Sequence, residues 1–281
     1  MIAPARLVKV TFVAVVLAAS IAAAVPGNAE PGHIVLASTT STENSGLLAD
    51  ILPLFQRRTG IEVRVVAVGT GQAIRLAQRG DADVLLLHHR PSEDAFVTQG
   101  YGLTRYNVMY NDFVLIGPRA DPAGIRSAQD VALAFAAIAG AGVIFASRGD
   151  DSGTHKKEIA LWQAAALDPR EASGRWYRET GSGMGATLNI AATLDAYVIS
   201  DRATWLRFAN KQHLEILVEG DPRLVNQYGV IVVDPARHPH VRVHQAQAFV
   251  GWLTSRPGQA AITAFRIGGE QAFFPNAKVN D

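Results

Sequence analysis

After residue 30 the chain alternates between short unbroken apolar runs and longer stretches whose apolar positions recur at helical spacing. The unbroken runs predict buried strands, and the periodic stretches predict helices. In the first part of the chain we expect strands at 33–37, 63–68 and 84–87 and helices at 47–55, 73–78 and 93–97. Strands that alternate with helices predict a parallel sheet, and such sheets bind ligands where their strands end.

The pattern changes after residue 107. Two long extended runs, 108–118 and 228–235, each end at a proline and are not followed at once by a helix. They predict a pair of connections between two lobes. Between them we expect a second α/β set, with helices at 128–139 and 186–192 and strands at 143–146, 197–200 and 214–218. Helices expected at 245–253 and 259–265 return to the first lobe. We therefore predict lobe one from 30–114 and 226–281, and lobe two from 115–225.

The predicted second lobe contains one densely polar turn, residues 147–158, which reads SRGDDSGTHKKE. The apolar run 143–146 precedes it, and Ile159, Trp162 and Ala166 follow at close to helical spacing. The segment is therefore predicted to be a strand, a tight turn and a helix.

The start of this helix favours an anion. Asp151 or Ser152 is a suitable N-cap, which would place Gly153 and Thr154 in the first helical turn. Unpaired backbone N–H groups and the positive end of the helix dipole then converge at one point, and Arg148 enters from the same turn. We interpret the segment as an anion-binding site. The alternative is a capped surface helix whose charges are solvated.

Two other loops are rich in hydroxyl groups and glycine. Residues 38–42 supply consecutive hydroxyls just before a predicted helix, and Gly69–Thr70–Gly71 follows the second predicted strand. The glycines do not complete a dinucleotide-binding fingerprint, because position 74 is Ile. Both loops can donate hydrogen bonds to one small ligand, although the first is also compatible with an ordinary N-cap.

The first 29 residues are predicted to be a signal peptide and not part of the fold. Arg6 and Lys9 flank an apolar run, 10–25, that ends before Gly27–Asn28–Ala29. The alternative is an N-terminal membrane anchor. Without residues 1–29 the chain has 24 basic and 25 acidic groups, a net charge of about −1, which suggests neither nucleic acid nor an anionic membrane as partner. The sequence has no Cys, so disulfides are excluded, and we expect a soluble periplasmic protein.

The sequence offers few groups for catalysis or metal binding. The eight His residues are mostly scattered, and the neighbours His88–His89 and His238–Pro239–His240 are too close in sequence to specify a tetrahedral metal set. We interpret them as surface or loop residues. No Gly-x-Ser-x-Gly elbow and no Gly-x-x-x-x-Gly-Lys-Ser/Thr loop occurs. Abundant donors without reactive groups are typical of a binding protein, so we expect no cofactor, no metal ligands and no catalytic residue.

Several segments resemble the tungstate-binding periplasmic component of an ABC importer: 38–48, 66–73, 108–113, 147–158, 183–189 and 217–222. The resemblance covers nearly all of the chain after the predicted signal. Members of this family generally show Thr-Thr-Thr-Ser in the first loop, where this chain has Ser38 in place of the first Thr and keeps the hydroxyl. The resemblance implies a type II periplasmic-binding-protein fold: two α/β lobes, each a mostly parallel sheet with flanking helices, joined by a two-strand hinge.

The resemblance also implies the ligand, the partners and the contact residues. The ligand would be a tungstate or molybdate oxyanion held between the lobes, and the partners would be the permease subunits of the importer. We expect the protein to be a monomer without stable membrane insertion. The implied ligand contacts are Ser38, Thr39, Thr40, Ser41, Gly69, Thr70, Gly71, Arg148, Ser152, Gly153 and Thr154, with His155 and Lys156 adjacent.

The identity of the anion depends on which partner its oxygens need. Tungstate is a dianion without a proton at neutral pH and requires donors alone, whereas phosphate usually carries a proton and benefits from an acceptor carboxylate. If Asp150 or Asp151 faces the ligand, phosphate is favoured; if both cap the helix or steady Arg148, a fully ionised oxyanion is favoured. A phosphate- or sulfate-binding protein is the alternative, followed by an exported enzyme acting on an anionic ester. Tungstate and molybdate have equal charge and nearly equal radius, so the sequence does not separate them.

Overall fold

The structure is a computed structural model that describes residues 32–278. The predicted signal peptide, 1–29, lies outside the described residues. Within residues 32–278, no helix is both long and apolar enough to cross a membrane.

The first lobe is built on three parallel strands in the order β2–β1–β3. Their register pairs Ser38 with Ala67 on one side and with Leu86 on the other, so the three strands end level with one another. The strands and the helices that connect or follow them are β1 (His33–Thr39), α1 (Thr40–Asn44), α2 (Leu47–Thr59), β2 (Glu62–Val68), α3 (Thr70–Gln78), β3 (Val84–Leu87) and α4 (Arg90–Thr98).

Two long strands join the lobes, as the extended runs predicted. Strand β9 (Val225–Val233) pairs antiparallel with β3 and with β4 (Gly102–Pro118), and the β4–β9 ladder ends at the pair Asp112–Val225. From Phe113 onward β4 pairs with β7 (Val198–Asp201) and β8 (Leu214–Val218) of the second lobe. Strand β4 therefore belongs to the sheets of both lobes, and the sheet is mixed rather than mostly parallel, because β4 and β9 both run antiparallel to their neighbours.

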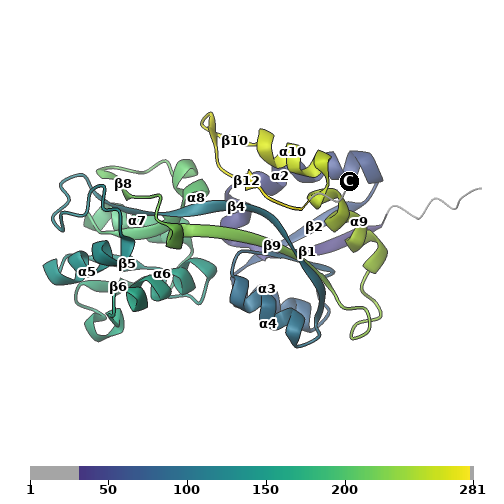
Figure 1. Cartoon of the computed structure of the whole chain (residues 1–281), viewed down its shortest axis with the longest axis horizontal. Helices are drawn as coiled ribbons and strands as arrows, with labels where there is room; N and C mark the ends of the chain where they lie inside the picture. The colour runs from purple at the N-terminus through teal and green to yellow at the C-terminus, as the bar shows by residue number, and fades with distance from the viewer. Residues whose placement is uncertain (1–31, 279–281) are drawn as a thin grey trace, which may run out of the picture. The chain divides into compact units, whose positions relative to one another are not determined.

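The second lobe surrounds the far half of β4. Its other elements are α5 (Val131–Ala141), β5 (Phe145–Ser147), α6 (Gly153–Ala164), the short 3-10 helix Pro169–Ala172, β6 (Tyr177–Glu179), α7 (Met184–Leu194), α8 (Arg202–Arg207) and a 3-10 turn, Pro222–Leu224. After β9 the chain returns to the first lobe with α9 (Val243–Thr254), α10 (Arg256–Ala264), β10 (Arg266–Ile267), β11 (Glu270–Gln271) and β12 (Phe274–Pro275). Figure 1 shows α5, α6 and α7 around one end of the crossing strands β4 and β9, and α3, α4, α9 and α10 around the other end.

The apolar core divides at the point where β4 changes its partner from β9 to β7. Two clusters combine residues 34–109 with 228–273, and two others lie within 113–224. Ala203 of α8 joins the first-lobe core, so this helix packs against the neighbouring lobe. The two-lobed α/β fold expected from the sequence is confirmed.

The helix after the polar turn differs from its predicted pattern. Its buried face consists of Glu158, Leu161 and Trp162, whereas Ile159 is only half-buried. Ala166 lies beyond the end of α6, with φ at +57°. The apolar spacing therefore located the helix but misplaced its inward face by one residue.

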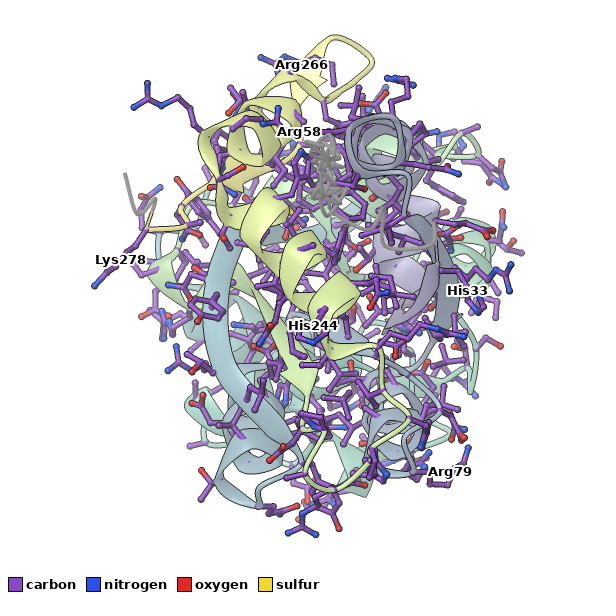
Figure 2. The ribbon with its side chains drawn as sticks, turned by 90° about the vertical axis from the view of Figure 1, so that its right-hand side faces the viewer. His33, Arg58, Arg79, His244, Arg266 and Lys278 are labelled. Atoms are coloured by element: carbon purple, nitrogen blue, oxygen red, sulfur yellow. The ribbon has the colours of Figure 1, made fainter. Side chains whose placement is uncertain are left out.

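Basic side chains are dispersed over the surface. Figure 2 shows Arg58 and Arg266 near the top of the view, Lys278 at the left and Arg79 at the lower right, rather than one stripe of basic groups. The nearly balanced charge of the chain agrees with this arrangement, since a nucleic-acid site requires clustered basic groups.

Gly229, on the crossing strand β9, lies against a buried ion pair between Glu93 and Arg105, whose Oε2 and Nε atoms are 2.6 Å apart. A Cβ at Gly229 would be 2.3 Å from Glu93 Oε2 and 2.6 Å from Arg105 Nη2. We predict that Gly229→Ala lowers the free energy of unfolding by roughly 2–4 kcal/mol, because it overpacks the site and displaces a buried charge pair. Chemical denaturation measures the change. Gly251→Ala in α9, where the added Cβ meets nothing within 4 Å, is the control and should leave stability unchanged or slightly raised. Equal stability of the two variants would contradict the prediction.

Candidate functional site

Three loops of the first lobe begin side by side, because β1, β2 and β3 end at the same level of the sheet. They carry the hydroxyl run 38–41, the segment 69–71 and His88. Ligands of α/β sheets bind at this edge. The structure therefore brings together the first-lobe residues that the sequence singled out, and adds His88 to them.

The four hydroxyls of the run 38–41 have different surroundings. Ser38 donates to a backbone carbonyl of β3 at 2.8 Å, so its hydrogen is used within the sheet. Thr39 is the N-cap of α1, and its oxygen accepts a hydrogen bond from an amide of that helix. Thr40 is half-buried and Ser41 is buried. Thr40 and Ser41 are therefore the hydroxyls of this run best placed to meet a ligand.

The interpretation of His88 as a surface or loop residue is wrong. The residue is only 7% exposed, and the rings of Tyr228 and Phe113 lie 4.9 and 6.5 Å from its own. Its Nε2 atom lies 3.1 Å from Thr39 Oγ1 and 3.3 Å from Ser41 Oγ. Burial lowers the pKa of His88 to about 4, so the ring is neutral at pH 7.

The second loop of this edge places a helix N-terminus in the site. Helix α3 begins at Thr70, and its N-cap is Gly69, which has no side chain to accept a hydrogen bond. The amides of Thr70 and Gly71 have no carbonyl available within the helix. The hydroxyl of Thr70 is also buried and has no partner within residues 32–278.

The second lobe contributes the N-terminus of α6. Of the two candidate caps, Ser152 is the one used: its Oγ accepts a hydrogen bond from the amide of His155 at 3.2 Å. Gly153 and Thr154 therefore occupy the first helical turn, as predicted, and their amides again lack a carbonyl within the helix. Thr154 is buried.

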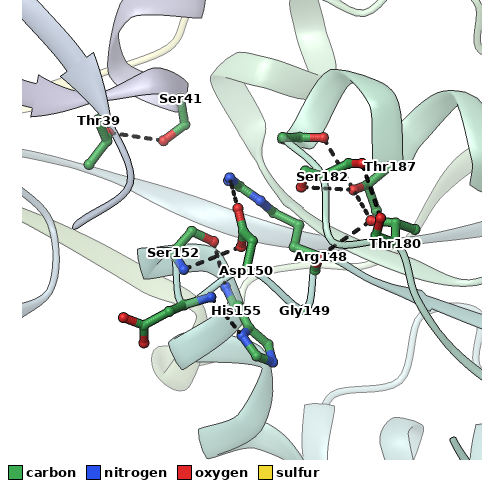
Figure 3. Close-up of polar contacts among 12 residues, drawn as sticks. Thr39, Ser41, Arg148, Gly149, Asp150, Ser152, His155, Thr180, Ser182 and Thr187 are labelled. Atoms are coloured by element: carbon green, nitrogen blue, oxygen red, sulfur yellow. Dashed lines mark hydrogen bonds and ion pairs between the residues drawn. The ribbon is translucent and has the colours of Figure 1, made fainter. Parts of the chain in front are cut away.

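Arg148 lies at the same turn and is 3% exposed. Its Nη2 atom is 2.5 Å from Asp150 Oδ2, and the other oxygen of Asp150 accepts from the amide of Ser152 at 3.2 Å. Figure 3 shows the Asp150 carboxylate between the guanidinium and the start of the helix. Asp150 therefore steadies Arg148 and the turn, which is the arrangement that the sequence argument associated with a fully ionised anion.

The neighbouring side chains contact one another rather than Arg148. The amide of Asp151 donates to His155 Nδ1 at 3.2 Å, and Lys156 Nζ forms an ion pair with the Asp151 carboxylate and donates to its carbonyl at 2.7 Å. Asp151 itself is exposed. The side chains of His155 and Lys156 are thus engaged by Asp151 at the rim of the site.

Two glycines lie where the donor loops of the two lobes approach one another. A Cβ at Gly153 would be 2.8 Å from His88 Cε1 and 3.2 Å from Thr70 Oγ1, and a Cβ at Gly71 would be 2.7 Å from Asp151 Oδ2. A side chain at Gly153 would require His88 to move, and one at Gly71 would require Asp151 to move. The donors of the first-lobe loops and of the α6 turn therefore belong to a single site.

Buried polar atoms without a partner concentrate in this site. Six buried side-chain N or O atoms in the described range 32–278 lack a hydrogen-bond partner, and three of them are Thr70 Oγ1, Arg148 Nε and Thr154 Oγ1. Each such group costs about 1–3 kcal/mol, and native proteins rarely leave them unpaired. Two hydroxyls and a guanidinium can all donate. An anion with several oxygens is the partner that satisfies all three.

A buried carboxyl that sequence reasoning missed supports the turn from below. Glu158, 1% exposed, accepts hydrogen bonds from Ser147 at 2.8 Å, Tyr177 at 2.7 Å and Trp162 at 3.2 Å. These contacts fix the end of β5 and the first turns of α6 relative to each other. Burial raises the pKa of Glu158 to about 7.

The loop before α7 supports Arg148 from the other side. The amide of Thr180 donates to the carbonyl of Ser147 at 2.9 Å, and the Thr180 hydroxyl donates to the carbonyl of Arg148 at 3.4 Å. The same hydroxyl lies 2.8 Å from that of Thr187, as Figure 3 shows. The backbone that presents Arg148 is therefore held on both sides.

The arrangement is that of an anion-binding protein: a mixed α/β fold of two lobes, with backbone, hydroxyl and guanidinium donors facing one another between them. Within residues 32–278, no group of three or more His, Asp or Glu residues could hold a metal ion.

Comparisons with known proteins agree with this class. A family model described as a PBP superfamily domain matches residues 24–257. A putative ABC transporter anion-binding protein of Haloferax volcanii is 48% identical over 256 residues, which cover 89% of this chain and 74% of that protein. The tungstate-binding protein TupA of Peptoclostridium acidaminophilum is 46% identical over 250 residues, which cover 88% of this chain and 86% of that protein. The solved structure of the tungstate-binding protein TupA from Desulfovibrio alaskensis G20 has a TM-score of 0.78 and 45% identity, and covers 88% of this chain and 100% of that one.

The chain therefore belongs to the PBP superfamily. The resemblance to tungstate-binding components of ABC importers, given on its motifs above, is confirmed. These comparisons do not test the individual contact residues, which stay predictions.

Glu158 generates a prediction about stability and pH. The folded protein holds the Glu158 proton up to about pH 7, whereas an unfolded Glu releases it near the ordinary pKa of 4.5. Between these values the folded state binds more protons, so the contribution of Glu158 to stability is complete below pH 4.5 and is lost as the pH rises through 7. Glu158→Gln resembles the protonated form, so its free energy of unfolding should fall less than that of the wild type between pH 5 and 8.

Denaturation at several pH values measures this difference, whose slope is at most about 1.4 kcal/mol per pH unit. Glu43→Gln, which changes an exposed carboxyl on α1, is the control and should follow the wild type. Parallel profiles for Glu158→Gln and the wild type would show that Glu158 does not hold its proton in the folded state.

Proposed function

We propose that this protein captures tungstate, or molybdate, between its two lobes and delivers it to the permease of an ABC importer. The observation that carries the proposal is the group of buried, unpartnered donors that Thr70, Arg148 and Thr154 direct into one site. Relatives named as tungstate-binding proteins and as an anion-binding protein of an ABC transporter support the same ligand class.

Three acceptors next to the site are already engaged, which favours an anion without a proton. Asp150 accepts from Arg148 and from the Ser152 amide. The Nε2 atom of His88 lies within hydrogen-bonding distance of two hydroxyls, and Glu158 accepts three hydrogen bonds below the turn. A protonated phosphate would bring a hydrogen that finds no free acceptor among these groups, and an unpaired buried hydrogen is strongly disfavoured. Fully ionised tungstate requires only donors.

The contacts we propose come from both lobes. In the first lobe they are the hydroxyls of Thr40, Ser41 and Thr70 and the amides of the α3 N-terminus. In the second lobe they are the Arg148 guanidinium, the Thr154 hydroxyl and the amides of Gly153 and Thr154. Ser38 donates its hydroxyl hydrogen to the Leu86 carbonyl, and the side chains of His155 and Lys156 contact Asp151, so we leave these three residues out of the proposed contacts.

The remaining assignments accompany this function. We propose a periplasmic protein exported by the predicted signal peptide, acting as a monomer without catalytic activity; the relatives are named as binding and transport proteins. We keep lobe boundaries of 30–114 and 226–281 for lobe one and 115–225 for lobe two. The change of β4 from β9 to β7 near Phe113 supports them.

Calorimetric titration of the purified protein with tungstate, molybdate, sulfate and phosphate tests the function. We predict tight, stoichiometric binding of tungstate and molybdate, with a Kd for phosphate higher by roughly 100-fold or more, because the phosphate hydrogen lacks an acceptor. Sulfate is also free of protons but smaller, and so separates the effect of size from that of protonation. Tighter binding of phosphate than of tungstate would refute the proposal.

Replacement of Arg148 tests the centre of the site. We predict that Arg148→Ala weakens tungstate binding by roughly 2–5 kcal/mol, because a desolvated dianion loses its buried countercharge. Arg148→Lys should fall between this variant and the wild type, since it keeps the charge and loses the directed pair of hydrogen bonds. Arg170→Ala, which removes an exposed arginine of the same lobe, is the control. Thermal melts confirm folding, and wild-type affinity in folded Arg148→Ala would remove this turn from the site.

A further inference from the structure

His88 contacts the proposed ligand-binding hydroxyls on one side and the crossing strands on the other. Its Nδ1 atom lies 3.1 Å from Asn226 Oδ1 on β9. The amide nitrogen of Asn226 donates to Asn111 Oδ1 on β4 at 2.7 Å, and Asn111 and Asn226 pair directly in the β4–β9 ladder. Since Asn226 turns its nitrogen to Asn111, it presents its oxygen to His88. The ring hydrogen of His88 must therefore lie on Nδ1.

The other ring nitrogen of His88 is then a hydrogen-bond acceptor. Burial between Tyr228 and Phe113, together with the nearby charge of Arg148, keeps the ring neutral, so Nε2 carries a lone pair. Its neighbours are the hydroxyls of Thr39 at 3.1 Å and Ser41 at 3.3 Å. Nε2 can accept one of these two hydrogens.

The surroundings of Thr39 decide which hydroxyl gives its hydrogen. Thr39 Oγ1 accepts from the amide of Thr42 at 3.2 Å, and the hydroxyls of Thr42 and Ser41 lie 2.7 and 3.1 Å from it. The Thr42 hydroxyl is the nearer of the two, so we assign the second accepting position of Thr39 to Thr42 rather than to Ser41. A hydroxyl has one hydrogen to donate and two positions at which it accepts. If Thr39 donates to His88 and accepts both groups of Thr42, all its hydrogen bonds are made within the protein. Ser41 is then the hydroxyl whose hydrogen remains available.

We infer that His88 is a positioning residue of the binding site, which takes the hydrogen of the Thr39 hydroxyl and so leaves the Ser41 hydroxyl free to donate to the bound oxyanion. Asn226 acts one step further away, because it fixes the ring hydrogen on Nδ1. The inference rests on the proposed oxyanion function and adds to it a residue that neither the motifs nor the relatives assign.

Titration of tungstate into three variants tests the positioning role. His88→Phe keeps a ring between Tyr228 and Phe113 and removes both nitrogens, and it should raise the Kd by about 10- to 100-fold, as loss of an orienting partner commonly does. Ser41→Ala should also raise it. In the double variant the loss of binding free energy should be smaller than the sum of the two single losses, since His88 acts through the hydroxyls of this loop.

A control and a selectivity measurement separate positioning from simple destabilisation. Val84→Ala creates a cavity in the core of the neighbouring strand β3, so it should lower the melting temperature while leaving the Kd within about twofold of the wild type. His88→Phe should also lower the Kd for phosphate divided by the Kd for tungstate. The hydroxyls of Thr39 and Ser41 would no longer be oriented by the ring and could accept the phosphate hydrogen. A merely structural residue would leave this ratio unchanged.

Nitrogen NMR of protein labelled at histidine reads the hydrogen position directly. We expect His88 in the wild type at pH 7 to show a protonated Nδ1 and an unprotonated Nε2, assigned by the loss of its signals in His88→Phe. Asn226→Leu should shift this pattern toward protonated Nε2 and raise the Kd in the same direction as His88→Phe. The Kd of Asn226→Leu for tungstate tests the inference even if His88→Phe does not fold.

The outcomes distinguish this inference from the proposed function. If the wild type binds none of the four anions, the function fails and the positioning role fails with it. If the wild type binds tungstate, the inference alone is overturned by an unchanged Kd in folded His88→Phe, by additive effects in the double variant, or by a wild-type Nε2 that carries the hydrogen.

Discussion

The site depends on a positive charge that is almost fully buried. Arg148 is 3% exposed. Within the described residues its only ion pair joins Nη2 to Asp150, and its Nε atom has no hydrogen-bond acceptor. A buried charge is tolerated only where hydrogen bonds and opposite charge surround it. The supports of the turn follow from this requirement: Thr180 contacts the backbone on one side, and the Glu158 network holds Ser147 below. The remaining donor capacity of the guanidinium points to a ligand that is itself an anion.

The crossing strands make the two halves of the site one structure. Strand β4 pairs with β9 as far as Asp112 and with β7 from Phe113, so movement of one lobe relative to the other must bend the chain near this point. The side chains of Asn111 and Asn226 meet at the same point and connect to His88. Hinges of this kind lie at a few residues near the ends of elements. The chain of contacts from the hinge to the binding hydroxyls is therefore continuous.

Much of the fold could be predicted because its signals are local. The alternation of strands and helices, the two long extended runs and the cap at Ser152 each depend on residues close in sequence, and the structure has all of them. The direction of β4 and β9 depends on pairing with strands far away in the sequence. The expectation of a mostly parallel sheet was therefore wrong for these two strands. The start of α6 was found, but its inward face was not, because Glu158 occupies a buried position where the pattern favours an apolar residue.

The hydrogen-bond donors of the site could be predicted from the sequence, but the residues that position those donors could not. The hydroxyl and glycine loops and Arg148 stand in motifs whose chemistry is visible in the residues themselves. His88 was predicted to be a surface residue because the residues that bury it, Phe113 and Tyr228, lie on strands distant from it in the sequence. His88 directly follows β3, and the other two parallel strands of the same sheet, β1 and β2, end in donor loops; this position was the available signal. That signal depends on the arrangement of the strands. It indicates a site residue only when β1, β2 and β3 are known to end at the same level of the sheet.

Closure of the lobes and choice of anion follow from the same atoms. Thr70 belongs to the first lobe and Arg148 and Thr154 to the second, so their unpartnered donors can share a ligand only when Gly153 lies against His88, as it does here. An anion that needs only donors satisfies all of them and stabilises this approach of the lobes. A protonated anion instead brings a hydrogen to a place where Asp150 and His88 already have their partners, so the approach itself becomes unfavourable. Under the proposed function, selectivity against protonated anions would therefore act on an equilibrium between open and closed lobes, since a ligand shifts such an equilibrium only by its difference in affinity for the two states.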